Sequence, residues 1–212
     1  IMKTSGAGFS ILDREEILRK IETVKETVKG DLPNVYLLHG DFTDEEMNEL
    51  YNHPKVKAHV NLTHGEGFGR PLLEASISQK PIIASDWSGH TDFLFKDLAI
   101  MIKGSMSAVE KGSVPDDFLI EGSQWFTVNY RDASSAMKSV YKNYKKYTIN
   151  AKKLGIINKS KFSLNAMTRK FGKILDKYVP EFAQEVKLQL PKLKKVGSTE
   201  TPKITLPKLK KV

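Results

Sequence analysis

The sequence predicts an α/β fold in which a parallel sheet is covered by helices on both faces. Three observations support this class. Short apolar stretches alternate with amphipathic stretches of helical length over residues 1–102. A glycine-rich turn, residues 65–70, separates one of the strands from the helix that follows it. The chain has 212 residues, of which 40% are hydrophobic, and is therefore long enough for one domain with a buried core.

Five short segments have the composition of buried strands. They combine β-branched and other apolar residues and are bounded by glycine, proline or polar residues. In chain order they are residues 1–5, 35–39, 56–62, 81–85 and 98–102. Because helical segments separate the first four, we expect the strands to run parallel and ligands to bind beyond their carboxyl ends. Residues 103–128, which contain three glycines and a proline, are predicted to be rich in loops.

Six segments are predicted to form helices, mostly from apolar residues three and four positions apart. They are residues 13–29, 43–51, 71–78, 133–147, 149–160 and 164–179. Asp13 is a candidate N-cap of the first helix, and Gly30 is its candidate stop. Thr43 and Glu46 have the spacing of a capping box in the second. Pro71 suits the first turn of the third helix, where its missing N–H group is not needed.

The net charge of +9 is concentrated near the C-terminal end of the sequence. Residues 186–212 hold eight Lys and one Glu, a net of +7, which leaves 9 − 7 = +2 for residues 1–185. This segment contains two copies of a ten-residue motif, residues 187–196 and 203–212. We therefore divide the chain into a domain of residues 1–182 and a basic, flexible tail of residues 183–212. The tail is either a solvated extension or a segment that adds strands to a sheet edge or makes weak contact with an anionic surface.

Composition also excludes several classes of function. The globular part has no recognition motif for nucleic acid, so no nucleic-acid partner is expected. The sequence has no cysteine and its five histidines show no ligand spacing, so no metal site is expected. No apolar run approaches the roughly 20 residues that span a bilayer, and no signal peptide is recognisable, so a cytoplasmic location is expected. The start at Ile1 rather than Met suggests a fragment of a longer protein.

The turn of residues 65–70 is the candidate site. Gly65, Gly67 and Gly69 allow the backbone to approach a ligand closely. The helix predicted to begin near Pro71 directs its unpaired N–H groups and the positive end of its dipole to the same place, which favours a diphosphate. Arg70 adds a cation to this site.

Two carboxylates flank the glycines of this turn. Glu66 lies in the turn itself, and Glu74 lies about one helical turn into the helix. Because a carboxylate accepts hydrogen bonds from two vicinal hydroxyls, Glu74 is the candidate for a ribose and Glu66 for a sugar. His64 precedes Glu66 by two residues and either shapes the turn or contacts the ligand. Residues 87–92 follow the next strand and are a candidate second wall of the site.

These residues resemble the E-x7-E region of retaining glycosyltransferases with the GT-B fold, of the large family 4 type. Glu66 and Glu74 match the two acids of that region. The similarity is clearest over residues 35–94. Residues 161–164 and the helix after them resemble the Phe-Ser-Trp segment and final helix of these enzymes, with Leu164 in place of Trp. The resemblance therefore covers roughly residues 1–179.

The resemblance implies a Rossmann-like domain, the C-terminal donor-binding half of a GT-B fold. Such a domain takes part in transfer of a sugar from a nucleotide-sugar donor to an acceptor, with retention and without an essential metal or a cofactor. The acceptor, whether saccharide, lipid or protein, is not indicated. The arginine and lysine with which the family binds the diphosphate, and its whole N-terminal domain, lie outside this chain. We therefore expect the chain alone to bind its donor weakly and not to catalyse.

The resemblance also implies roles for single residues. Glu66 contacts the donor sugar and supports the reaction, and is the candidate catalytic residue. Glu74 binds the ribose. The backbone amides of Gly67, Phe68 and Gly69 contact sugar or phosphate. Phe42, which follows the glycine at the end of the preceding strand, is a candidate for lining the base.

Two other functions remain open. Residues 6–10, Gly-Ala-Gly-Phe-Ser, are a rival phosphate-binding turn, at which a nicotinamide-dependent oxidoreductase would bind its dinucleotide. This turn lacks the third glycine of the dinucleotide fingerprint. The remaining alternative is a noncatalytic interaction module whose basic tail recruits an acidic partner.

Overall fold

A computed structural model describes residues 1–6, 8–110, 112–113 and 120–180. The chain divides into two compact units, Ile1–Phe171 and Gly172–Val212. The boundary falls within helix α6 (Leu164–Tyr178), whose last turns are most of what is described of the second unit. The predicted tail of residues 183–212 lies outside the described residues, so its role and its boundary stay predictions.

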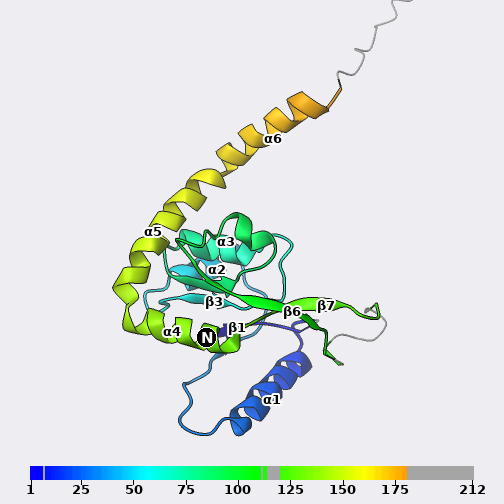
Figure 1. The fold of residues 1–212 in the computed structure, drawn as a ribbon, viewed down its shortest axis with the longest axis vertical. Coiled ribbons are helices and arrows are strands. Elements are labelled where there is room, and N and C mark those ends of the chain that lie inside the picture. The colour runs from blue at the N-terminus through cyan, green and yellow to red at the C-terminus, as the bar shows by residue number, and fades with distance from the viewer. Residues whose placement is uncertain (7, 111, 114–119, 181–212) are drawn as a thin grey trace, which may run out of the picture. The chain divides into compact units, whose positions relative to one another are not determined.

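The first unit is a mixed α/β fold with two small parallel sheets (Figure 1). In one sheet, β1 (Met2–Lys3) pairs with β2 (Leu37–Leu38). In the other, β4 (Ile82–Ser85) lies between β3 (His59–Asn61) and β5 (Ile100–Ile102). All three pairings are parallel, as predicted. We expected one continuous sheet, but no backbone ladder joins the two sheets among the described strands.

Helices lie on both faces of these sheets, as the alternation of segments predicts. In Figure 1, α2 (Asp44–Asn52) and α3 (Arg70–Ile77) lie above β3, whereas α1 (Ile11–Thr27) and α4 (Tyr130–Lys142) lie below. Helix α5 (Tyr144–Lys161) packs against α3.

The helix caps confirm one prediction and correct another. In the capping box of α2, Thr43 Oγ1 accepts a hydrogen bond from the Glu46 amide at 3.2 Å, and Glu46 Oε2 accepts one from the Thr43 amide at 2.9 Å. Asp13 is not the N-cap of α1. Ser10 takes that position, with its hydroxyl accepting from the Asp13 amide at 3.1 Å. The Asp13 carboxylate instead accepts a hydrogen bond from the Gly6 amide.

The prediction of loops over residues 103–128 is wrong in part. This region contains an antiparallel hairpin of β6 (Gly104–Ala108) and β7 (Gln124–Val128). The predicted break between the next two helices is also misplaced, because α4 ends at Lys142 and α5 begins at Tyr144. Asn143 lies between them with a non-helical φ of −121°.

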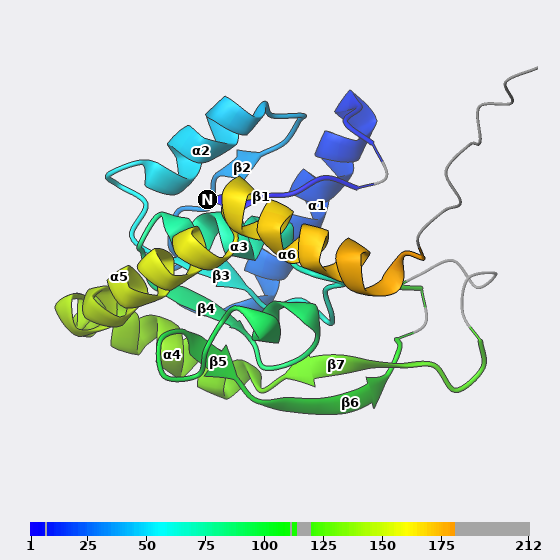
Figure 2. The ribbon, with the colours of Figure 1, turned by 90° about the horizontal axis from the view of Figure 1, so that it is seen from above.

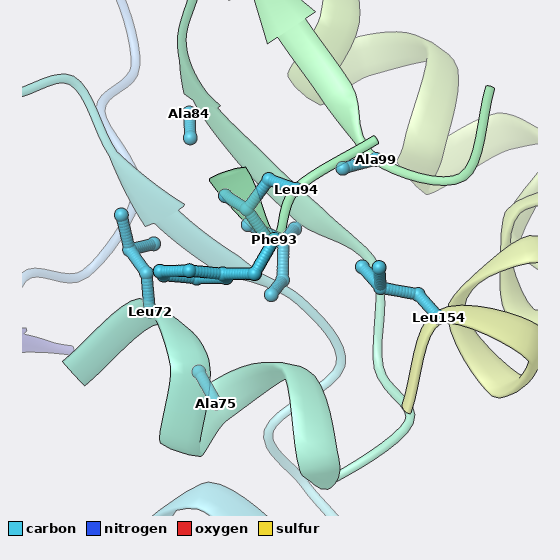
Figure 3. Close-up of a cluster of buried hydrophobic side chains, with 8 residues drawn as sticks. Leu72, Ala75, Ala84, Phe93, Leu94, Ala99 and Leu154 are labelled. Carbon is cyan, nitrogen blue, oxygen red and sulfur yellow. The ribbon is translucent and has the colours of Figure 1, made fainter. Parts of the chain in front are cut away.

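The core of the unit fixes α3 against the β3–β4–β5 sheet (Figure 3). Its cluster of buried side chains consists of Leu72, Ala75, Ile82, Ala84, Phe93, Leu94, Ala99 and Leu154. Asn158 of α5 is fully buried, and its amide donates to Ser76 Oγ of α3 at 2.9 Å and to the Phe93 carbonyl at 3.2 Å. These contacts hold α3 against the β3–β4–β5 sheet and against α5.

Candidate functional site

The turn of residues 65–70 leaves backbone amides free at the start of α3. Gly69 is the N-cap of the helix and has a left-handed conformation, with φ of 86°. The N–H groups of Gly67, Phe68, Gly69 and Arg70 donate no hydrogen bond to any residue that the structure describes. Four consecutive donors, three on exposed residues and one on the buried Gly69, therefore remain unpaired at the positive end of a helix dipole, an arrangement that suits a phosphate or another anion.

The backbone of Glu66 is held by the segment that follows β4. Its amide donates to Ser88 Oγ at 2.9 Å, and its carbonyl accepts from the Gly89 amide at 2.9 Å and from the Ser88 hydroxyl. Gly89 lies so close that a Cβ atom there would overlap the Gly67 carbonyl. Residues 87–92, which contain the short 3₁₀ helix η1 (Gly89–Asp92), therefore lie directly against the turn. Their role as a wall of a ligand site stays a prediction.

The carboxylate of Glu66 is half-buried and free of cations. Asn61, the last residue of β3, places its amide nitrogen 3.5 Å from Glu66 Oε1. Within the described part of the chain, no lysine, arginine or histidine lies within 4.0 Å of this carboxylate. Most of its capacity to accept hydrogen bonds is therefore available to a ligand.

Glu74 lies in a different environment. Its Oε1 is 3.0 Å from Arg70 Nε, one helical turn earlier, and Arg70 extends toward Asp44 of α2, 3.9 Å away. Burial, with a smaller effect of the Glu74 charge, raises the pKa of the nearby Tyr51 to about 12. The Arg70 side chain is 74% exposed, so the pair is held loosely at the surface. The two acids of the motif thus contact different neighbours on either side of the free amides.

His64 is fixed by the β6–β7 hairpin. Its Nδ1 lies 2.7 Å from the Phe126 carbonyl oxygen and must donate to it, because a carbonyl can only accept. Its ring is stacked on Trp125, with centroids 3.8 Å apart and planes inclined by 2°. Sequence reasoning missed both hairpin partners, although the alternation of residues in Gln124–Val128 is a strand signal. These contacts fix the His64 ring against the hairpin, and whether His64 also contacts a ligand stays a prediction.

Phe42 and Phe68 occupy different positions around the site. Phe42 follows β2, and Lys3 Nζ lies 4.7 Å from the centre of its ring. The same ammonium donates to the Gly40 carbonyl at 2.9 Å. The Phe68 ring packs on Phe93, 5.2 Å between centroids, and the residue as a whole is 43% exposed. Phe68 therefore places an unpaired backbone amide at the turn while its ring contacts Phe93.

The rival turn of residues 6–10 is less suited to an anion. Asp13 Oδ2 accepts a hydrogen bond from the Gly6 amide at 2.9 Å and lies 2.6 Å from His39 Nε2. The hydrogen bond with His39, followed by that from Gly6, lowers the pKa of Asp13, which keeps the carboxylate charged. A carboxylate of the protein thus already occupies the amide that a phosphate would need. Ala7 lies outside the described residues.

Three further findings concern the chain as a whole. In the described ranges, no group of three or more histidine, cysteine, aspartate or glutamate side chains is arranged to hold a metal ion. Among the helices described, none is long and apolar enough to cross a membrane. No protein-family model matches the chain, and no curated protein matches it.

Proposed function

We propose that this chain is the nucleotide-sugar-binding half of a retaining glycosyltransferase, with its parallel strands in a Rossmann-like arrangement. The observation that carries the proposal is the set of four free amides at residues 67–70, between Glu66 and Glu74. A nucleoside diphosphate sugar has a diphosphate between a ribose and a sugar. Along the chain, Glu66, the four amides and Glu74 follow one another, which matches the order of sugar, diphosphate and ribose in the ligand.

The environments of the two acids support different roles. Glu66 has no cation partner among the described residues, and its carboxylate accepts hydrogen bonds from the donor sugar. Glu74 accepts hydrogen bonds from the ribose hydroxyls once its partner Arg70 moves away. Because Arg70 is exposed and follows the free amides directly, it turns from Glu74 to the diphosphate when the ligand binds.

Calorimetry with UDP, GDP and ADP and with their glucose conjugates tests the proposal. Glu74→Gln should weaken binding of the preferred diphosphate about tenfold, since a hydrogen bond to a charged group contributes roughly 1.5–3 kcal/mol. The wild-type protein should prefer the ribonucleotide to its 2′-deoxy form, and the variant should not. Glu49→Gln, an exposed change on α2, is the matched control and should leave affinity unchanged.

Glu66→Gln separates the two acids. It should leave the affinity for the diphosphate unchanged but remove the additional affinity that the sugar provides. Unchanged binding of every diphosphate after Glu74→Gln would reject the ribose assignment. Binding of NAD that is indifferent to both glutamate changes would favour the oxidoreductase alternative instead.

A further inference from the structure

Helix α5 carries a repeat of seven residues on its exposed side. Two lysines are followed three positions later by an isoleucine, first in residues 145–149 and again in residues 152–156, and Lys159 begins a third copy. Because seven residues make about two helical turns, equivalent residues of the copies lie on one face of the helix. The buried residues of α5 lie on the opposite side and are Ala151, Leu154, Gly155 and Asn158.

The side chains of this repeat are all exposed. Ile149 and Ile156 are 58% and 63% exposed. Because the helix turns by about 100° per residue, both isoleucines lie between two rows of lysines. One row consists of Lys145, Lys152 and Lys159, the other of Lys146 and Lys153, and all five are exposed. These seven side chains form the outer face of α5. Figure 2 shows α5 at the left of the first unit, with α3 on its inner side.

No acid of α5 balances the charge of this outer face. Residues 144–161 contain six lysines and neither Asp nor Glu. Helix α1, in contrast, has five acids and four cations, and three ion pairs join them, including Lys20–Glu16 at 2.7 Å. Among the residues that the structure describes, no ion pair involves α5. The outer face therefore differs from a solvated helix face, on which both signs of charge alternate.

Two of the lysines also lie at the unfavourable end of the helix. Because α5 begins at Tyr144, Lys145 and Lys146 lie in its first turn, at the positive end of the helix dipole. The first turn of α2 carries three acids instead, Asp44, Glu45 and Glu46. Residues that break such a local preference are expected at functional surfaces.

The net charge of the sequence is divided between two regions of opposite sign. Residues 130–161, which form α4 and α5, hold nine Lys or Arg and one Asp, a net of +8. Residues 1–129 hold 13 Lys or Arg and 20 Asp or Glu, a net of −7. An anionic surface is therefore attracted by α4 and α5 and repelled by the residues before them, which favours one orientation of approach.

We propose that the outer face of α5 binds a membrane surface that contains anionic phospholipids. The lysine ammonium groups contact the lipid phosphates, and Ile149 and Ile156 enter the boundary between headgroups and acyl chains. A nucleic acid would match the lysines but would leave the isoleucines in water. Nucleic-acid surfaces use arginine and stacked aromatic rings, and the outer face has neither. The inference uses no residue of the candidate site and does not rest on the proposed function.

Co-sedimentation of the whole chain with lipid vesicles tests the proposal. Vesicles of equal parts phosphatidylcholine and phosphatidylglycerol should bind the chain about tenfold or more tightly than vesicles of phosphatidylcholine alone. Because residues 186–212 are also basic, two variants that each lose four lysines are compared. One has Gln at Lys145, Lys146, Lys152 and Lys153, and the other has Gln at Lys192, Lys194, Lys208 and Lys210.

The α5 variant should lose roughly a hundredfold or more in affinity for the mixed vesicles, since each lysine near an anionic surface contributes about fivefold. The second variant has the same net charge and should lose less than about tenfold. A loss in the α5 variant that is no larger than that in the second variant would overturn the proposal. Circular dichroism checks that both variants are folded.

A fluorescent label at Ile149 distinguishes insertion from attraction by charge alone. The chain has no cysteine, so Ile149→Cys provides a single attachment point for an environment-sensitive dye. Its emission should shift to the blue with the mixed vesicles, whereas a label on Glu49→Cys, at an exposed position of α2, should not shift. Unchanged emission at Ile149 would contradict insertion. Equal affinity for a single-stranded RNA oligonucleotide, with the same loss in the α5 variant and no blue shift, would identify a nucleic acid as the partner instead.

Discussion

Gly89 is the residue at which the smallest change should disturb the candidate site most. A methyl group there would overlap the Gly67 carbonyl and lie 2.8 Å from the Glu66 carbonyl oxygen. Because both neighbours are backbone, the turn must move. Gly89→Ala should lower the free energy of unfolding by about 1–3 kcal/mol, as overpacking does, and should weaken diphosphate binding. Urea denaturation and calorimetry measure the two effects.

Gly67→Ala is the matched control for stability. An added Cβ at Gly67 meets no atom within 4 Å, and its φ is not left-handed. Its free energy of unfolding should stay within about 0.5 kcal/mol of wild type. Equal stability of the Gly89 and Gly67 variants would show that residues 87–92 do not brace the turn.

Single residues of the site could be found from sequence where the signal is local. Glu66, Glu74 and the glycines between them lie in one continuous segment, so their spacing is visible in the sequence. Ser88 supports Glu66 from 22 positions away, and only the folded chain shows its hydrogen bonds. The N-cap of α1 was misassigned because both Ser10 and Asp13 are residue types that favour this position.

At the scale of elements, the β6–β7 hairpin should determine the position of His64. Trp125→Ala removes the ring stacked on His64 and should lower the free energy of unfolding by about 2 kcal/mol. It should also release the hydrogen bond from His64 Nδ1 to the Phe126 carbonyl. Nitrogen-15 NMR of the histidine ring detects this release as a change in the fraction protonated at Nδ1.

Tyr141→Ala on α4 is the control for this element. Its side chain is 88% exposed, so its loss should cost less than about 0.5 kcal/mol and leave the His64 spectrum unchanged. If the His64 signals are the same in wild type and in the Trp125 variant, the hairpin does not position this ring.

Helices and strands could be predicted from sequence where their composition and their boundary residues indicated the same element. The capping box of Thr43 and Glu46 and the apolar strand at Ile82–Ser85 both combine composition with a clear boundary. The hairpin was missed because Gly104 begins β6 and other glycines and a proline lie between the strands. Gly104 does not mark a loop. The strands pack closely at this residue, and a Cβ atom there would overlap the Thr127 carbonyl. Such a tertiary contact leaves no trace in local sequence.

For the whole molecule, stability should fall as the pH drops from about 6.5 to about 4. Burial, followed by the nearby Lys80 charge, lowers the pKa of His59 from 6.5 to about 4. The unfolded chain then binds a proton more readily than the folded chain in this range. The contribution of neutral His59 is complete above pH 6.5 and is lost toward pH 4, a change of about 3 kcal/mol.

His59→Gln should remove this part of the pH dependence, whereas His53→Gln, at an exposed position, should retain it. Urea denaturation at intervals between pH 7 and pH 4 gives the comparison. If the free energy of unfolding changes with pH equally in wild type and in the His59 variant, the lowered pKa of His59 is wrong.

The sequence predicted the α/β class of the fold but not the division of its parallel strands into two sheets. Alternating segments indicated parallel strands with helices on both faces, and the first unit has them. The sequence could not predict that β1–β2 and β3–β4–β5 form separate sheets. Pairing between strands depends on contacts between segments that are distant in the sequence, and the composition of one strand does not reveal its neighbours. Val60 illustrates this: it belongs to a predicted strand, yet it is 48% exposed and lies on β3, which pairs only with β4 among the described strands.

Among the described strands, β1 pairs only with β2 and β3 pairs only with β4, and these sheet edges bear on how the chain behaves in concentrated solution. Unpaired strand edges with apolar side chains such as Val60 are templates for pairing between molecules, the first step toward fibrous aggregates. During expression and storage, the chain should therefore lose material to aggregation as its concentration rises, which light scattering over a concentration series would measure.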